Sequence, residues 1–268
     1  MIFVRSALYN LYFWTVTAVM AIASLPIRFF LPDAALAYGK LWVRILLGGL
    51  APLAGIRIAV TGRENLPETG PALIASQHQS AFDTLVWLTL VPRPAYVLKR
   101  ELLKLPFFGP MVRPAGQIPI DRAGGASAVR SLLAEADRAL AAGRQIIIFP
   151  EGTRVAPGKV GPLAPGIAAL ATHTGLPVIP VATDSGRLWA RRGFFRRPGT
   201  IRIAIRPPLP PRLPRQELLA RLRALYEAGP GEAPPKAAGT GSELVENSVE
   251  SPSARFLAGQ RNLFHSSD

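Results

Sequence analysis

Two short polar segments hold the residues best suited to chemistry. Residues 77–83 (QHQSAFD) contain His78 and Asp83, and residues 149–154 (FPEGTR) end with Arg154. A histidine can accept a proton near neutral pH, and a carboxylate on its other ring nitrogen fixes the tautomer and stabilises the imidazolium. An arginine binds phosphate through two parallel hydrogen bonds. Together the segments predict an enzyme that removes a proton from a substrate carrying phosphate.

The spacing of the first pair restricts how it can be built. Five residues of an α-helix turn the chain by about 500°, which leaves the two side chains about 140° apart and off a common face. Contact therefore requires His78 before a helix and Asp83 in its first turn. Because an apolar run at 72–76 precedes His78, we expect the histidine at the end of a strand, where α/β folds place their sites. A capping histidine beside a helix-start aspartate is the alternative interpretation.

The second segment follows the apolar run 145–148. Pro150 ends the strand ladder, and Gly152 permits a tight turn with close backbone approach. Thr153 and Arg154 are then exposed at the carboxyl end of a strand. A surface turn with a solvated arginine is the alternative.

Short apolar runs alternate with helical stretches from residue 56 onward. The expected strands are 56–61, 72–76, 95–98, 117–120, 145–149, 178–182 and 200–205. The expected helices are 81–90, 126–142, 166–173 and 215–228. This alternation predicts an α/β fold with a mixed sheet flanked by helices.

An uncharged apolar run at 11–27 lies between Arg5 and Arg28 and is near the lower limit for crossing a bilayer. Aromatic residues gather at both of its ends, so we expect it to span the membrane or to lie shallowly in it. A cleaved signal peptide is the alternative. A second apolar run, 41–60, is interrupted by arginines and glycines and is expected to be interfacial. Cations after the first run outweigh those before it, which predicts an inner-membrane protein whose main domain faces the cytoplasm.

Composition limits the possible classes of protein. The 268 residues are 49% hydrophobic, enough for a sizeable core, and the net charge of +14 predicts an anionic partner such as lipid, nucleic acid or phosphate. The absence of cysteine excludes disulfides, thiolate nucleophiles and cysteine-based metal sites.

We expect three parts in the chain. These are a membrane-anchoring helical segment at 1–55, an α/β domain at 56–228, and a tail at 229–268 that is rich in glycine, proline, serine and glutamate. The composition of the tail predicts disorder, with a short docking helix near 254–264 as the alternative.

Beyond these patterns, the chain resembles the 1-acyl-glycerol-3-phosphate (lysophosphatidic acid) acyltransferase family over roughly residues 60–210. Four blocks stand in the family's order. They are His78-x4-Asp83 with GRENLP and GPA before it; Lys99-Arg-Glu-Leu102 with PFFG and IPIDR; FPEGTR at 149–154; and VIPV at 178–181.

The resemblance implies that His78, assisted by Asp83, deprotonates the hydroxyl of a lysophospholipid. That hydroxyl would then attack the thioester of acyl-CoA or acyl-carrier protein to give phosphatidic acid. It further implies substrate binding by Lys99, Arg122, Glu151, Gly152, Thr153 and Arg154, and shaping of the acyl or thioester region by Pro180. No cofactor, metal or covalent enzyme intermediate is implied.

Three positions depart from the family pattern. Gln77 stands where asparagine is usual, Ala164 where lysine is common, and Asp184 where asparagine is common. The histidine, aspartate and arginine are intact, so the reaction class is kept. An acyltransferase for another lysolipid, such as lyso-ornithine lipid or another lysophospholipid, is therefore the nearest alternative.

Two alternatives come from other classes. A lipid hydrolase would need a nucleophile, but no Gly-x-Ser-x-Gly elbow occurs and Ser80 has no independent support. A noncatalytic membrane or nucleic-acid binder would explain the basic and aromatic segment 187–197, but not the four ordered blocks. We therefore expect an anionic membrane surface, and no nucleic acid, as the partner.

Overall fold

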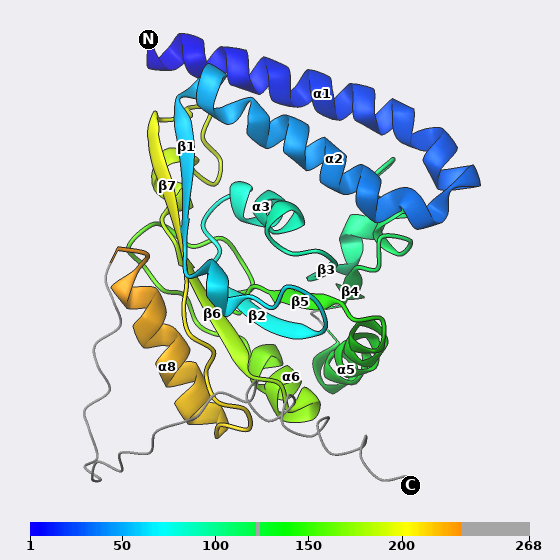
Figure 1. Cartoon of the computed structure of the whole chain (residues 1–268), viewed down its shortest axis with the longest axis vertical. Coiled ribbons are helices and arrows are strands. Elements are labelled where there is room, and N and C mark those ends of the chain that lie inside the picture. The colour runs from blue at the N-terminus through cyan, green and yellow to red at the C-terminus, as the bar shows by residue number, and fades with distance from the viewer. Residues whose placement is uncertain (122–123, 232–268) are drawn as a thin grey trace, which may run out of the picture. The chain divides into compact units, whose positions relative to one another are not determined.

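The computed structural model describes residues 1–121 and 124–231, and its centre is a seven-stranded sheet (Figure 1). The strand order is β1-β7-β6-β2-β5-β3-β4, and neighbours run parallel except for the antiparallel pair β6 and β7. The strands are β1 (Ile56–Thr61), β2 (Ala72–Ser76), β3 (Pro94–Lys99), β4 (Ile118–Ile120), β5 (Gln145–Ile148), β6 (Val178–Thr183) and β7 (Gly199–Ile205). The prediction of a mixed sheet flanked by helices is confirmed.

Helices cover both faces of this sheet. They are α1 (Ile2–Phe30), α2 (Ala35–Gly48), α3 (Phe82–Leu90), α4 (Gly109–Val112), α5 (Gly125–Ala141), α6 (Gly166–Thr174), α7 (Ser185–Leu188) and α8 (Arg215–Ala228), with shorter helical turns η1 (Pro32–Ala34), η2 (Leu50–Ala54), η3 (Arg63–Asn65) and η4 (Arg100–Lys104). The expected strands and the four expected helices of the α/β region all occur, with ends within two residues of the predicted ones.

The central strand β2 shows how the two layers of helices are held. Leu73 and Ala75 pack into a core cluster with α5, α6 and α8, whereas Ile74 packs into a second cluster with α1, α2 and α3. All five residues of β2 are buried. A parallel strand covered on both faces reads as a continuous apolar run, which is why the sequence here shows no alternation.

The two N-terminal helices form an antiparallel pair beside the sheet. The Tyr12 hydroxyl donates to the Ile45 carbonyl at 2.6 Å, and the Tyr38 hydroxyl donates to the Met20 carbonyl at 2.6 Å. Tyr9 of α1 is fully buried in the core cluster that contains α3. These helices are therefore packed parts of the protein.

The apolar run at 41–60 contains a helical part and most of the predicted strand 56–61. Helix α2 begins earlier, at Ala35, and the helical part ends at Ala54. Residues 56–60 belong instead to the edge strand β1, which pairs with β7.

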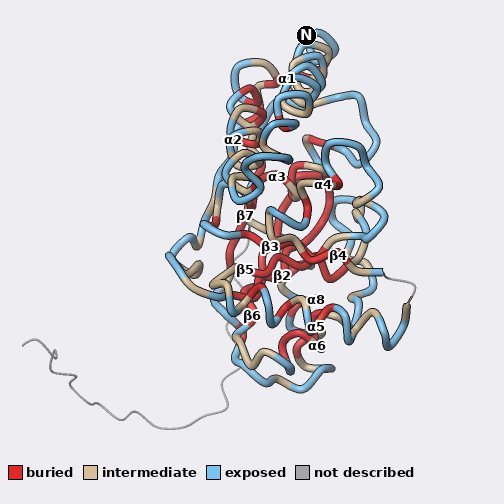
Figure 2. The backbone as a smooth tube through the Cα atoms, turned by 90° about the vertical axis from the view of Figure 1, so that its right-hand side faces the viewer, coloured by how far each residue is buried: buried red, intermediate tan, exposed pale blue. Residues whose placement is uncertain are grey.

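Helix α1 is mostly exposed, whereas the strands are mostly buried (Figure 2). Its exposed side carries a stripe of large apolar residues that includes Leu8, Leu11, Ile22 and Phe29. Both N-terminal helical stretches, Ile2–Phe30 and Pro32–Ala54, are long and apolar enough to cross a membrane. The exposed apolar surface indicates a membrane location. Most of the predicted tail, including the alternative helix at 254–264, lies outside the described residues.

Candidate active site

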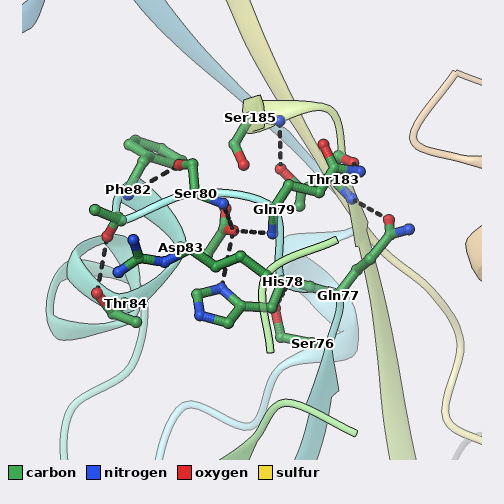
Figure 3. A network of polar contacts seen from close by, with 12 residues as sticks. Ser76, Gln77, His78, Gln79, Ser80, Phe82, Asp83, Thr84, Thr183 and Ser185 are labelled. Carbon is green, nitrogen blue, oxygen red and sulfur yellow. Dashed lines mark hydrogen bonds and ion pairs between the residues drawn. The ribbon is translucent and has the colours of Figure 1, made fainter. Parts of the chain in front are cut away.

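His78 and Asp83 are in contact at the carboxyl end of β2 (Figure 3). His78 lies in the loop between β2 and α3, and Asp83 is in the first turn of α3. The Nδ1 atom of His78 is 3.2 Å from Oδ2 of Asp83. Because an acceptor oxygen faces Nδ1, the favoured tautomer carries its proton there and leaves Nε2 as the basic nitrogen.

The same carboxylate oxygen also holds the loop. Asp83 Oδ2 accepts hydrogen bonds from the backbone N–H groups of Gln79 at 2.6 Å and Ser80 at 2.7 Å. Asp83 is 2% exposed, so these bonds replace the water that the charge would otherwise need. The loop and the histidine are thereby positioned by one buried charge.

Two glutamine side chains join the histidine loop to the end of β6. Gln77 Oε1 accepts from the Thr183 N–H at 3.3 Å, and Gln79 Nε2 donates to the Thr183 carbonyl at 2.7 Å. Gln79 Oε1 also accepts from the Gly186 N–H at 3.2 Å. Both glutamines are buried, so this connection is well shielded from water.

Glu151 lies behind the histidine. Its Oε2 accepts from the backbone N–H of His78 at 2.8 Å, and its Oε1 accepts from the N–H of Gly161 at 3.3 Å. Burial raises the pKa of Glu151, and the two N–H groups oppose that rise. Its carboxylate is thus directed at the backbone, and Glu151 does not line the cavity described below.

The turn after β5 brings Arg154 to the same region. Gly152 has φ of 66°, a left-handed conformation that glycine adopts without steric cost, and its N–H donates to the Phe149 carbonyl at 2.9 Å. The Val155 N–H donates to the His78 carbonyl at 2.8 Å, which ties this turn to the histidine loop. Burial lowers the pKa of Arg154, and the Asp83 charge raises it. An arginine remains protonated at neutral pH in such a setting.

A cavity of about 770 Å³ opens beside these residues, and most of its wall is apolar. Its lining comes from Thr17, Met20, Ala21, Ser24, Ala35, Leu36, Tyr38, Gly39, Trp42, Thr84, Leu85, Leu88, Tyr96, Val97, Leu98, Lys99, Leu102, Leu105, Pro106, Phe107, Phe108, Met111, Val112, Ala115 and Gln117, with His78, Phe149, Gly152, Thr153, Arg154, Arg191 and Arg192. It can hold a long apolar chain together with an anionic group.

The cavity collects most of the predicted site residues. His78, Lys99, Gly152, Thr153 and Arg154 line it, and Asp83 supports His78 from behind. Pro180 does not line it; this residue lies in β6, paired with Ala75 of β2. Arg122 is outside the described residues.

Several lining residues were not singled out from the sequence. The Phe149 ring stacks on the His78 ring with centroids 4.4 Å apart, and Tyr96 stacks behind Phe149. Arg191 and Arg192 reach the cavity from a loop that the sequence marked only as basic and aromatic. The high density of arginines in residues 187–197 could have pointed to Arg191 and Arg192. No sequence pattern pointed to the stacking of Phe149 on His78.

The site offers less support for a serine nucleophile or for a metal ion. The Ser80 hydroxyl is fully buried, accepts from the Phe82 N–H at 3.0 Å, and does not line the cavity. Within residues 1–121 and 124–231 there is no group of three or more histidine, aspartate or glutamate residues that could hold a metal ion.

Comparison with protein families gives a match to the acyltransferase family model over residues 57–184. A 1-acyl-sn-glycerol-3-phosphate acyltransferase of Pseudomonas aeruginosa is 40% identical over 166 residues, which cover 62% of this chain and 64% of that protein. The 1-acyl-sn-glycerol-3-phosphate acyltransferase alpha of Mus musculus is 32% identical over 170 residues, covering 62% of this chain and 60% of that protein. The aligned region thus spans just under two thirds of these relatives.

A solved structure shares the fold. The crystal structure of the 1-acyl-sn-glycerophosphate acyltransferase of Thermotoga maritima superposes with a TM-score of 0.64 at 24% identity, covering 85% of this chain and 95% of that one. The likeness extends beyond the α/β region, because 85% of this chain is more than residues 56–228 make up.

Proposed function

We propose that this chain, which matches the acyltransferase family model over residues 57–184, transfers a fatty acyl group from a thioester to the sn-2 hydroxyl of 1-acyl-glycerol-3-phosphate, giving phosphatidic acid. The observation that carries the proposal is a histidine and aspartate pair placed at a largely apolar cavity that also contains Arg154. A lysophosphatidic acid has the matching parts: an acyl chain, a hydroxyl and a phosphate.

The reaction needs one base and no covalent enzyme intermediate. His78 Nε2 takes the proton of the acceptor hydroxyl as its oxygen attacks the thioester carbon, and Asp83 stabilises the imidazolium that forms. When the tetrahedral intermediate collapses, the carbon–sulfur bond breaks and the imidazolium returns the proton to the leaving thiolate. The products are the ester and the free thiol, and His78 is again neutral.

The remaining site residues bind the substrate or hold His78 in position. Arg154 pairs with the phosphate of the acceptor, and Gly152, Thr153 and Lys99 contact substrate from the cavity wall. Glu151 acts by holding the backbone of His78, because its carboxylate is used by two N–H groups. Arg122 stays a proposed phosphate contact, and Pro180 would influence the thioester region only through its neighbouring strand.

Acyl-CoA or acyl-carrier protein serves as the donor in this proposal, and no metal or cofactor takes part. The three departures from the family pattern lie outside the cavity, which supports lysophosphatidic acid as the acceptor. Gln77, Ala164 and Asp184 do not line the cavity, and Asp184 is instead paired with Arg202 at 3.3 Å. The three changes therefore leave the residues proposed to bind phosphate untouched.

We also propose how the protein meets the inner membrane, with its catalytic domain on the cytoplasmic side. Helix α1 carries an exposed apolar stripe, while its other side meets the domain at Ser6, Tyr9 and Asn10 and packs on α2 farther along. A stripe that runs along one side of a helix suits an orientation in the plane of the membrane. The helix then lies along the interface with the stripe in lipid.

His78→Ala tests the mechanism, with protein purified in detergent micelles and supplied with labelled donor and lysophosphatidic acid. Acyl transfer should fall by a factor of about 100 or more, since general base catalysis contributes roughly that much. His173→Ala is the matched control, because His173 also pairs with an aspartate, Asp137 at 2.8 Å, but on the exposed surface. Retained activity in His78→Ala would overturn the mechanism. A panel of other lysolipids, offered to the wild type, would show whether a different lysolipid is the preferred acceptor.

A further inference from the structure

A second turn carries arginine side chains into the cavity beside Arg154. The Gly193 N–H donates to the Ala190 carbonyl at 3.4 Å, so Arg191 and Arg192 occupy the two central positions of a turn. Both line the same cavity as His78 and Arg154. We call residues 190–193 the arginine turn.

The arginine turn and Arg154 contact each other directly. Arg154 Nη1 donates to the Arg191 carbonyl at 3.4 Å, and Arg191 Nη1 donates to the Arg154 carbonyl at 3.2 Å. Among the described residues, none of the three guanidinium groups has a carboxylate within ion-pair distance. Burial lowers the pKa of Arg154 most, the Asp83 charge raises it, and Arg191 lowers it again. Three neighbouring cations, none in an ion pair among the described residues, form a site suited to a multiply charged anion.

The base of this loop is firmly packed. Trp189 and Arg196 form an antiparallel bridge, and the Arg196 guanidinium lies over the Trp189 ring at 4.6 Å. Arg196 Nη1 also donates to the Gly193 carbonyl at 2.7 Å, which closes the turn. Trp189 is 3% exposed and meets the Tyr9 ring of α1 edge-on, with centroids 5.6 Å apart. The turn is therefore preorganised on a buried base.

Helix α1 holds the same loop from outside. The Arg196 N–H donates to the Ser6 hydroxyl at 2.9 Å, and the Asn10 amide donates to the Phe194 carbonyl at 2.9 Å. The exposed Phe194 ring contacts the Phe3 ring at 5.4 Å between centroids. The loop is thus attached to the helix whose apolar stripe faces lipid.

We propose that the arginine turn is the second half of the acceptor's phosphate site, with Arg191 and Arg192 binding phosphate oxygens opposite Arg154. This inference rests on the proposed function and deepens it. Three cations complement the two negative charges of a phosphate monoester better than the single charge of a phosphodiester. The turn therefore selects lysophosphatidic acid over lysolipids with esterified headgroups.

Kinetics in neutral detergent micelles test the proposal, because such micelles add no anionic surface. In Arg191→Gln and in Arg192→Gln, the KM for lysophosphatidic acid should rise about tenfold, because each variant loses one charge-assisted hydrogen bond to the phosphate. The kcat and the KM for the donor should stay unchanged. The preference over lysophosphatidylcholine, whose phosphate is esterified, should shrink as well. Arg197→Gln is the matched control: it removes the same charge from the same loop, but Arg197 does not line the cavity.

Three results would overturn the proposal. One is an unchanged acceptor KM in both arginine variants. Another is a rise in the KM for acyl-CoA alone, which would assign the turn to the phosphate monoester of the donor. The third is an equal effect of Arg197→Gln, which would assign it to general surface charge. The proposed function fails separately, if the wild type does not acylate lysophosphatidic acid at all.

Discussion

At the scale of single residues, one carboxylate oxygen organises the catalytic loop. Asp83 Oδ2 accepts from the His78 ring and from two backbone N–H groups. In Asp83→Asn the amide oxygen can take the same place, so the fold should persist while the negative charge is lost. We expect kcat to fall by a factor of about 100 or more, because the imidazolium formed in the reaction loses its counter-charge.

Circular dichroism and thermal melting of Asp83→Asn will show whether the loop has kept its structure. If the variant is folded and retains the wild-type kcat, the carboxylate has only a structural role.

Glu151 makes stability depend on pH in an unusual direction. Burial raises its pKa above the ordinary value of 4.5, so the folded protein binds this proton more tightly than the unfolded chain does. Stability from this group is therefore full below 4.5 and is lost as pH rises through the raised pKa. Relative to Glu151→Gln, which does not titrate, the wild type should melt at progressively lower temperature over that range. Parallel melting curves for the two proteins would contradict this.

The positions of some residues could be predicted from the sequence and those of others could not, for a physical reason. His78 and Asp83 are five positions apart at a strand end, and helix geometry leaves one arrangement in which they touch. Glu151 stands in an equally suggestive motif, but whether a side chain faces a cavity or the backbone depends on tertiary packing. The motif predicted a substrate contact, whereas the structure places the carboxylate on two N–H groups.

At the scale of elements, α7 lies close against the histidine loop. A Cβ atom on Gly186 would be 2.9 Å from Gln79 Cβ and 2.9 Å from Pro157 Cγ. Gly186→Ala should therefore displace the loop, destabilise the fold by about 1 to 3 kcal/mol, and lower kcat. Gly48→Ala, where no atom lies within 4 Å, is the control for the added methyl group. Equal melting temperatures and rates in both variants would show that the loop adjusts freely.

The link between α1 and the arginine turn gives a second prediction for elements. Asn10→Ala removes the hydrogen bond to the Phe194 carbonyl and should loosen the loop. The acceptor KM should then rise a few-fold while kcat stays the same, since a contact of this kind contributes about 0.5 to 1.5 kcal/mol. Thr15→Ala, at an exposed position of the same helix, should leave both constants unchanged. A fall in kcat without a change in KM would point to the catalytic loop instead.

The ends of helices and strands could be predicted from the sequence where a short apolar run was flanked by turn residues. The central strands β2 and β5 are short, apolar and flanked by turn residues, so their pattern was unambiguous. The apolar run 41–60 overlaps the predicted strand 56–61, because hydropathy alone does not separate an apolar helix from an edge strand that follows it directly. Gly55, with φ of 71°, marks the boundary between η2 and β1.

At the scale of the whole molecule, the exposed stripe of α1 predicts how tightly the protein binds membranes. Leu11 is 67% exposed and Ile22 is 63% exposed, and both would enter lipid. Replacing both by glutamine should weaken binding to phospholipid vesicles by a factor of about 100 or more, at about 1.5 to 3 kcal/mol for each side chain. Cosedimentation with vesicles measures this, and Ala134→Gln on α5, across the sheet, is the control. Unchanged cosedimentation would place the membrane contact elsewhere.

Charge and composition predicted an anionic partner but not its position. The net charge of +14 is spread over the chain, and only folding brings Arg154 together with Arg191 and Arg192. The cavity likewise takes its lining from helices, strands and loops far apart in sequence. No local pattern contains such a site, so its shape could not be predicted from the sequence.

The position of α1 has a kinetic consequence. Thr17, Met20, Ala21 and Ser24 form part of the cavity wall, while the opposite side of the same helix is the apolar stripe. An acceptor held in the leaflet can then enter by lateral diffusion without crossing bulk water. Turnover should follow the mole fraction of acceptor in the bilayer and should fall on surface dilution with inert lipid, even when the total amount per volume is constant.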